Sequence, residues 1–109
     1  MVTPELYKLL RAHYRCEGDG YVCHLDYEPW LGAQDGEVSA PVRYSIKERS
    51  HSVTRVAMHY QFLIEPGVPT TDREVVLHLK SAPPPQCWRL GDLITPTGES
   101  LATSYAGKP

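Results

Sequence analysis

Two histidines are the residues of this chain whose type and spacing first suggest chemistry. His59 lies in the alternating stretch VTRVAMHYQFLI, and His78 lies in EVVLHLK. If the two stretches pair around a loop at 65–73, both imidazoles point to one polar face, within about a diagonal of each other. Two imidazoles can begin a metal site or an acid–base site. Because no third ligand is obvious unless Asp26 or Glu28 folds over, half-exposed sheet histidines are the favoured interpretation.

Acidic and aromatic residues gather in the segment CHLDYEPWLGAQDGE. Paired carboxylates can perform acid–base chemistry when their environments separate their pKa values. They can also satisfy backbone amides in turns, which is the favoured role, and Asp35 before Gly36 is typical of a turn. The alternative is a recognition surface, because tryptophan and tyrosine often dominate binding energy at interfaces. The contact candidates are Asp26, Tyr27, Glu28, Trp30 and Asp35.

No catalytic signature stands out in the sequence. It has no GxSxG, no glycine-rich phosphate loop and no cysteine in a catalytic motif. We therefore expect a protein that is not an enzyme and needs no cofactor or metal. The alternative is a small-molecule pocket with acid–base chemistry, lined by His59, Tyr60, His78 and Asp92.

The three cysteines carry information about compartment. Cys16 and Cys23 flank the short loop EGDGYV, which a disulfide could close in an oxidising compartment. A Cys23–Cys87 bridge is a poorer candidate, and three reduced thiols are the remaining alternative. The spacing fits neither CxxC nor a zinc pattern.

Length and composition indicate one globular domain over 1–109. Hydrophobic residues make up 41% of the 109 residues and charged residues 22%, which is typical of a packed core. A formal net charge of -2 argues against a nucleic-acid partner. No apolar run is long enough to span a bilayer. TPELYKLL enters a helix at once, so no leader is visible. We expect a periplasmic or envelope location if a leader has been removed, and a cytoplasmic one if the chain is complete.

The elements that must position these residues follow from periodicity and capping. Thr3, Pro4 and Glu5 predict a helix start, and Gly18 predicts an end near Arg15. The stretch 53–64 alternates with period two, which predicts a long strand with one buried face. That face carries Val56, Met58, Tyr60, Phe62 and Ile64. Further strands are expected at 42–47, 74–80 and 87–94, and a short helix within ESLATSYA. The pattern predicts an α+β fold, with an N-terminal helix packed on a four-stranded antiparallel meander.

Several short words of this sequence resemble a bacterial domain family of unknown function. They are LLRAHY, LDYEPWLGAQDG, CWRLGDLI and SLATSY, with Leu25–Pro29, Gln34-Asp35 and Trp88–Leu90 the most specific. Members often follow a secretion or lipoprotein leader and are assigned to the NTF2-like, cystatin-like group. The resemblance implies a helix packed on a curved sheet and an envelope location, and it implies no reaction. The two close-set cysteines depart from the family pattern.

The function expected from these observations is binding without catalysis. We expect a protein of the bacterial envelope, most concretely an immunity or inhibitor protein that occludes a partner toxin or enzyme; this link is an analogy of fold. A homodimer that pairs through a free sheet edge is a further alternative.

Overall fold

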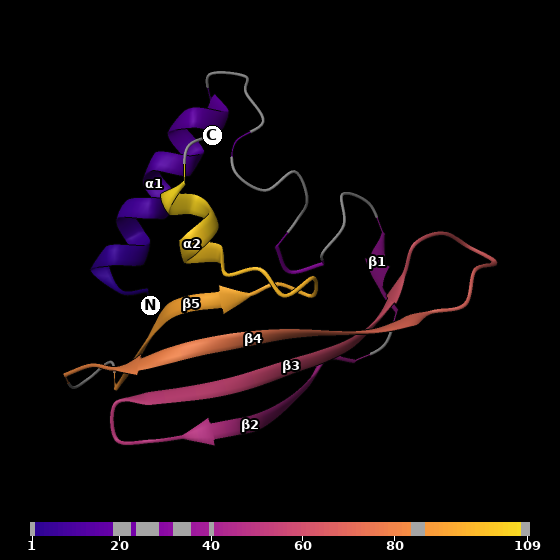
Figure 1. Cartoon of the computed structure of the whole chain (residues 1–109). Helices are drawn as coiled ribbons and strands as arrows, with labels where there is room; N and C mark the ends of the chain where they lie inside the picture. Colours follow the sequence, from indigo (N-terminus) through magenta and orange to yellow (C-terminus); the bar gives the residue numbers. More distant parts are fainter. Residues whose placement is uncertain are drawn as a thin grey trace.

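The computed structural model describes residues 2–18, 23, 29–31, 36–39, 41–83 and 87–107. In this part of the chain the helices are α1 (Pro4–Gly18) and α2 (Leu101–Ala106). The strands are β1 (Glu37–Val38), β2 (Arg43–Arg49), β3 (Val53–Leu63), β4 (Thr71–Ser81) and β5 (Trp88–Ile94). The expected α+β class, with a helix near the N-terminus, is confirmed. The two helices stand together beside β5, while β2 forms the far edge of the sheet (Figure 1).

All described strands belong to one curled antiparallel sheet that forms a half-barrel. β2, β3, β4 and β5 follow one another as a meander, as the short connections predict. The expected count of four strands is wrong, because β1 also pairs with β3, through Glu37 opposite Leu63 and Val38 opposite Phe62. β1 and β2 therefore share one side of β3.

β3 has the two faces that its alternation predicts. Tyr60 and Phe62 are buried, Met58 is half-buried, and Arg55 on the other face is exposed, although Ala57 on that face is also buried. Ile64 was expected on the buried face, but it follows the end of the strand and is exposed. We call the face with Tyr60 and Phe62 the inner face, and the one with Arg55 the outer face. The core packed on the inner face comprises Leu6, Tyr60, Phe62, Val75, Leu93, Leu101 and Tyr105.

Both helices are fixed by local capping and by mutual packing. The Thr3 hydroxyl accepts a hydrogen bond from the Leu6 amide at 3.2 Å, which satisfies a free donor in the first turn of α1. α1 extends to Gly18 instead of ending near Arg15. His13 is buried and its ring stacks on Tyr105 of α2, with centroids 4.0 Å apart. None of the helices in the described residues is long and apolar enough to cross a membrane.

The disulfide proposed between Cys16 and Cys23 is present. It joins the last turn of α1 to Cys23, which is fully buried. Cys87 lies outside this bridge and is exposed. A disulfide is compatible with folding in an oxidising compartment.

Replacing both bridged cysteines with serine is expected to lower the free energy of unfolding by about 2–3 kcal/mol. The bridge closes a loop of sequence separation 7 and so restricts the unfolded chain. Urea denaturation of the double variant checks this, with Cys87→Ser as the matched control that leaves the bridge intact. A double variant as stable as the wild type would contradict the expectation.

Candidate binding surface at the open sheet edge

The histidines proposed as a pair do not meet. His59 lies opposite Glu74, and His78 lies opposite Arg55, with the pair of Ala57 and Val76 between them. Both histidines are on the outer face, as expected, but they are not diagonal neighbours. The predicted diagonal placement is wrong because β4 begins at Thr71, before the expected start at Glu74, and this displaces the register of the hairpin.

Tyr60 points away from both histidines, onto the inner face. It is buried, and its hydroxyl donates a hydrogen bond to the backbone carbonyl of Trp30. Burial raises the pKa of Tyr60 above its ordinary value, and the positive charge of Arg73 partly opposes that change. The phenol is therefore protonated at neutral pH and fastens the turn that carries Trp30.

Asp92 has a structural task at the start of α2. Its carboxylate accepts hydrogen bonds from the Ser100 hydroxyl at 2.5 Å and from the Ala102 amide at 2.8 Å. A carboxylate at a helix N-terminus satisfies free amides and suits the helix dipole. The four residues proposed to line a pocket therefore lie in different parts of the fold and do not line one pocket together.

His59 belongs to an exposed polar network on the outer face. Its Nε2 lies 3.5 Å from the Ser45 hydroxyl and 4.0 Å from Glu74 Oε1. Lys47 donates to the same Glu74 oxygen at 2.9 Å. These contacts link β2, β3 and β4, but exposed ion pairs of this kind add little stability. Among the described residues, no three His, Cys, Asp or Glu side chains gather as metal ligands would.

His78 is expected to make the free energy of unfolding depend on pH. Burial lowers its pKa below the ordinary value, and Arg55 lowers it further, while Asp92 and Glu48 partly oppose the shift. Well above pH 6.5 the ring is neutral in both the folded and the unfolded state. As the pH falls through 6.5, the unfolded chain takes up the proton first, so the free energy of unfolding should decrease. His78→Gln should flatten this slope as the pH falls below about 6.5, in urea titrations at a series of pH values.

The matched control for that measurement is His51→Gln, since His51 lies in the exposed turn between β2 and β3. An equal slope in the His78→Gln variant and the wild type would refute the role of His78.

Only one of the five proposed contact residues lies among the described residues. Trp30 is in a turn over residues 29–31, and 41% of its surface is exposed. Tyr60 holds its carbonyl, and Arg73 donates to the next carbonyl, of Leu31, at 2.5 Å. This turn is therefore fastened to the inner face. The others, Asp26, Tyr27, Glu28 and Asp35, lie outside the described residues.

The two edges of the sheet differ in protection. At β5, Val2 forms a parallel bridge with Leu90, the Thr3 amide donates to the Leu90 carbonyl at 2.8 Å, and Ser100 bridges Ile94. At the other edge, β2 pairs with β3 on one side only, and no described strand lies on its other side. An unpaired edge presents backbone donors and acceptors to a partner strand.

Large apolar side chains are exposed on that open edge. Tyr44 lies opposite Met58 and Ile46 opposite Val56, so both project from the inner face. They are 65% and 61% exposed, because both helices lie beside β5 at the opposite edge (Figure 1). We call Tyr44, Ile46, Val56 and Met58 the open apolar strip. Sequence reasoning missed it, because VRYSIK has the same alternation whether or not its apolar face is covered.

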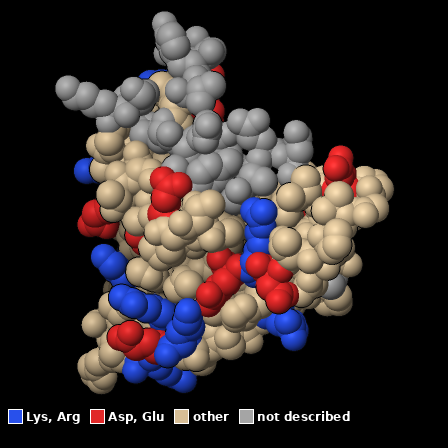
Figure 2. Space-filling view, turned by 45° about the vertical axis from the view of Figure 1, so that its right-hand side comes forward, with Lys and Arg blue, Asp and Glu red and all other residues tan. Residues whose placement is uncertain are grey.

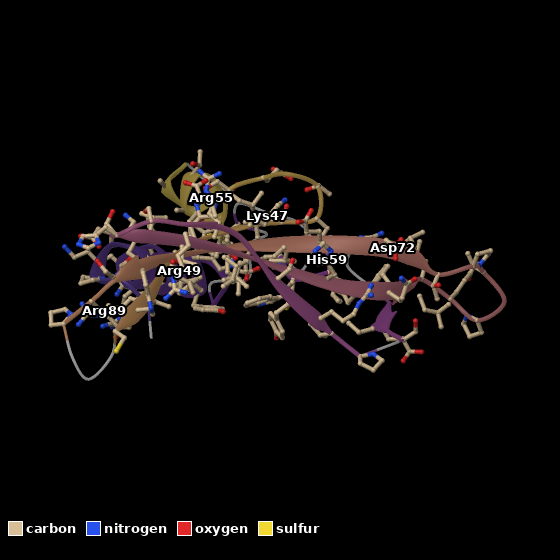
Figure 3. All side chains as sticks on the ribbon, turned by 90° about the horizontal axis from the view of Figure 1, so that it is seen from below. Lys47, Arg49, Arg55, His59, Asp72 and Arg89 are labelled. Carbon is tan, nitrogen blue, oxygen red and sulfur yellow. A yellow bond between two sulfur atoms is a disulfide. The ribbon has the colours of Figure 1, made fainter. Side chains whose placement is uncertain are left out.

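Positive charge gathers at one end of the sheet. Arg49, Arg55 and Arg89 lie at the end away from Asp72 (Figure 3). Figure 2 shows Lys and Arg side chains grouped there, with an acidic side chain among them. Lys80 lies at this end of the sheet, because it pairs with Arg89. Its side chain lies over Gly91, where an added Cβ would be 3.1 Å from Lys80 Cε. We call Arg49, Arg55, Lys80 and Arg89 the basic end.

Comparisons with protein-family models, curated proteins and solved structures yield no match for this chain.

Proposed function

We propose that this protein is a non-enzymatic binding domain that holds a protein partner at β2. The observation that carries the proposal is the combination on one strand of an unpaired backbone edge with two exposed apolar side chains, Tyr44 and Ile46.

An unpaired strand edge with exposed apolar side chains is suited to binding another strand. Proteins commonly blunt open edges, and here the β5 edge is covered by the residues around Val2 and Ser100. A partner strand on β2 would satisfy its backbone groups, and the open apolar strip would supply the hydrophobic contact. Fully burying one such side chain contributes about 1.5–3 kcal/mol. Trp30, whose carbonyl accepts a hydrogen bond from Tyr60 on the same inner face, is proposed as a further contact residue.

More specifically, we propose that this binding domain is an immunity or inhibitor protein of the bacterial envelope with an NTF2-like or cystatin-like fold. It acts by covering the active site of a toxin or enzyme. The sequence resemblance supports the fold and the location, and the Cys16–Cys23 disulfide is compatible with that location. Asp26, Tyr27, Glu28 and Asp35 complete the contact set of this proposal.

The test is capture of a partner from the native envelope fraction without reductant. Tagged wild-type protein is compared with the double variant Tyr44→Asp and Ile46→Asp, and the bound proteins are quantified by mass spectrometry. Truncating two central apolar contacts typically weakens an interface by a few kcal/mol, so we expect at least about thirty-fold less of a stoichiometric partner.

The matched control is Tyr7→Asp with Tyr14→Asp on α1, since Tyr14 is 67% exposed, much like Tyr44. The control variant should capture the partner as the wild type does. Equal capture by the β2 variant and the wild type would exclude the β2 edge as the binding surface.

A further inference from the structure

We infer that the partner of β2 is an acidic, extended segment of another protein, which adds to the sheet as one more strand. This inference rests on the proposed function and names the chemistry of the partner. It excludes a second copy of this chain as the occupant of the edge.

β2 carries an excess of positive charge. The strand holds three cations, Arg43, Lys47 and Arg49, against one acid, Glu48. Lys47 is already engaged with Glu74 at 2.9 Å, and Glu48 lies 3.9 Å from Arg55. Arg43 and Arg49 are exposed, and neither forms an ion pair with a described residue. The charge left unmatched on the open edge is therefore positive.

Self-pairing about Ser45 or Ile46, two residues near the centre of the strand, is disfavoured by the same residues. If two copies of β2 paired antiparallel about Ser45, Arg43 would lie opposite the partner's Lys47. If they paired about Ile46, Arg43 would lie opposite the partner's Arg49. Like charges directly opposite each other destabilise a strand pair, and edge cations are a common protection against self-association.

An acidic strand would fit both sides of the edge. Its apolar side chains would meet Tyr44 and Ile46 on the inner face, and carboxylates between them would face Arg43 on the outer face. β2 ends at the basic end of the sheet, where the register places Arg55, Lys80 and Arg89 on the outer face and Arg49 on the inner face (Figure 3). This concentration of positive charge would attract an acidic segment and favour its alignment along β2.

The test uses two short peptides on the full chain, one alternating glutamate with valine and the other alternating lysine with valine. Binding is followed by fluorescence anisotropy, and amide NMR shifts locate it on the protein. The glutamate peptide should bind at least about tenfold more tightly, shift the amides of Arg43–Arg49, and weaken as salt is added. Arg43→Glu with Arg49→Glu should reverse the preference.

The matched control is Lys8→Glu with Arg11→Glu, which makes the same charge change on exposed positions of α1. This variant should keep the preference for the glutamate peptide. Equal binding of the two peptides, no binding of either, or an unchanged preference in the β2 variant would each overturn the inference. If the protein sediments as a dimer and the β2 charge reversal strengthens that dimer, the edge binds a second copy of this chain. That result would also overturn the inference.

The envelope capture separates the two proposals. If Tyr44→Asp with Ile46→Asp abolishes capture while Arg43→Glu with Arg49→Glu leaves it unchanged, the binding function stands and the acidic strand fails. If neither pair of substitutions changes capture, both fail.

Discussion

Replacing Phe62 with alanine is expected to lower the free energy of unfolding by about 3–5 kcal/mol, since this is the usual cost of removing a fully buried phenylalanine. Phe62 is 0% exposed and lies in the core that joins β3 to both helices. The guanidinium of Arg73 lies 4.1 Å from the centre of its ring, which adds a cation–π contact. Equilibrium urea denaturation measures the change.

Phe62→Leu is the control for this substitution. Leucine keeps most of the apolar volume, so we expect a smaller loss than for alanine. If Phe62→Ala cost less than about 1 kcal/mol, the placement of the ring at the centre of the core would be wrong. Arg73 also holds the carbonyl of Leu31, so the core beneath β3 and the turn bearing Trp30 share a residue.

Several elements of this fold follow from local signals in the sequence. Threonine before proline and glutamate marks the start of α1, and the alternation of 53–64 identifies β3 and its buried face. β1 does not follow from such signals, since a two-residue strand inside a proline- and glycine-rich segment has no periodicity. Its existence depends on the pairing of Val38 with Phe62.

The hairpin register shows why the predicted site failed. Thr71, Asp72 and Arg73 follow a proline-containing loop and are polar, so they resemble its continuation. In the structure they lie opposite Phe62, Gln61 and Tyr60 and extend β4. The Gln61 side chain donates a hydrogen bond to the Asp72 carboxylate. It also accepts a hydrogen bond of 3.0 Å from the Thr70 hydroxyl. Cross-strand partners thus override the local preference, and His59 and His78 are separated as a result.

The open edge is a property of the assembled fold. Whether Tyr44 and Ile46 are covered depends on where the helices pack. That position is set at β5 by the Thr3 amide on Leu90 and by the Asp92 carboxylate on α2. The first contact joins residues far apart in sequence, and the second joins β5 to α2 across ten residues, so neither lies within a single element.

Replacing Gly36 with alanine is expected to lower the free energy of unfolding by about 2–5 kcal/mol, which is the sum of backbone strain and overpacking. Gly36 has φ +126°, and a Cβ there would stand 2.2 Å from Cζ of Phe62 and 2.9 Å from the Leu63 carbonyl oxygen. Gly67→Ala is the matched control, since Gly67 has φ +88° with nothing within 4 Å, and its cost should be about 1 kcal/mol of backbone strain. Urea denaturation of both variants isolates the contact with Phe62, and equal losses would show that no such contact exists. Because Gly36 directly precedes β1, the Gly36→Ala substitution would also release β1 from β3. The core that supports the binding edge would then be exposed.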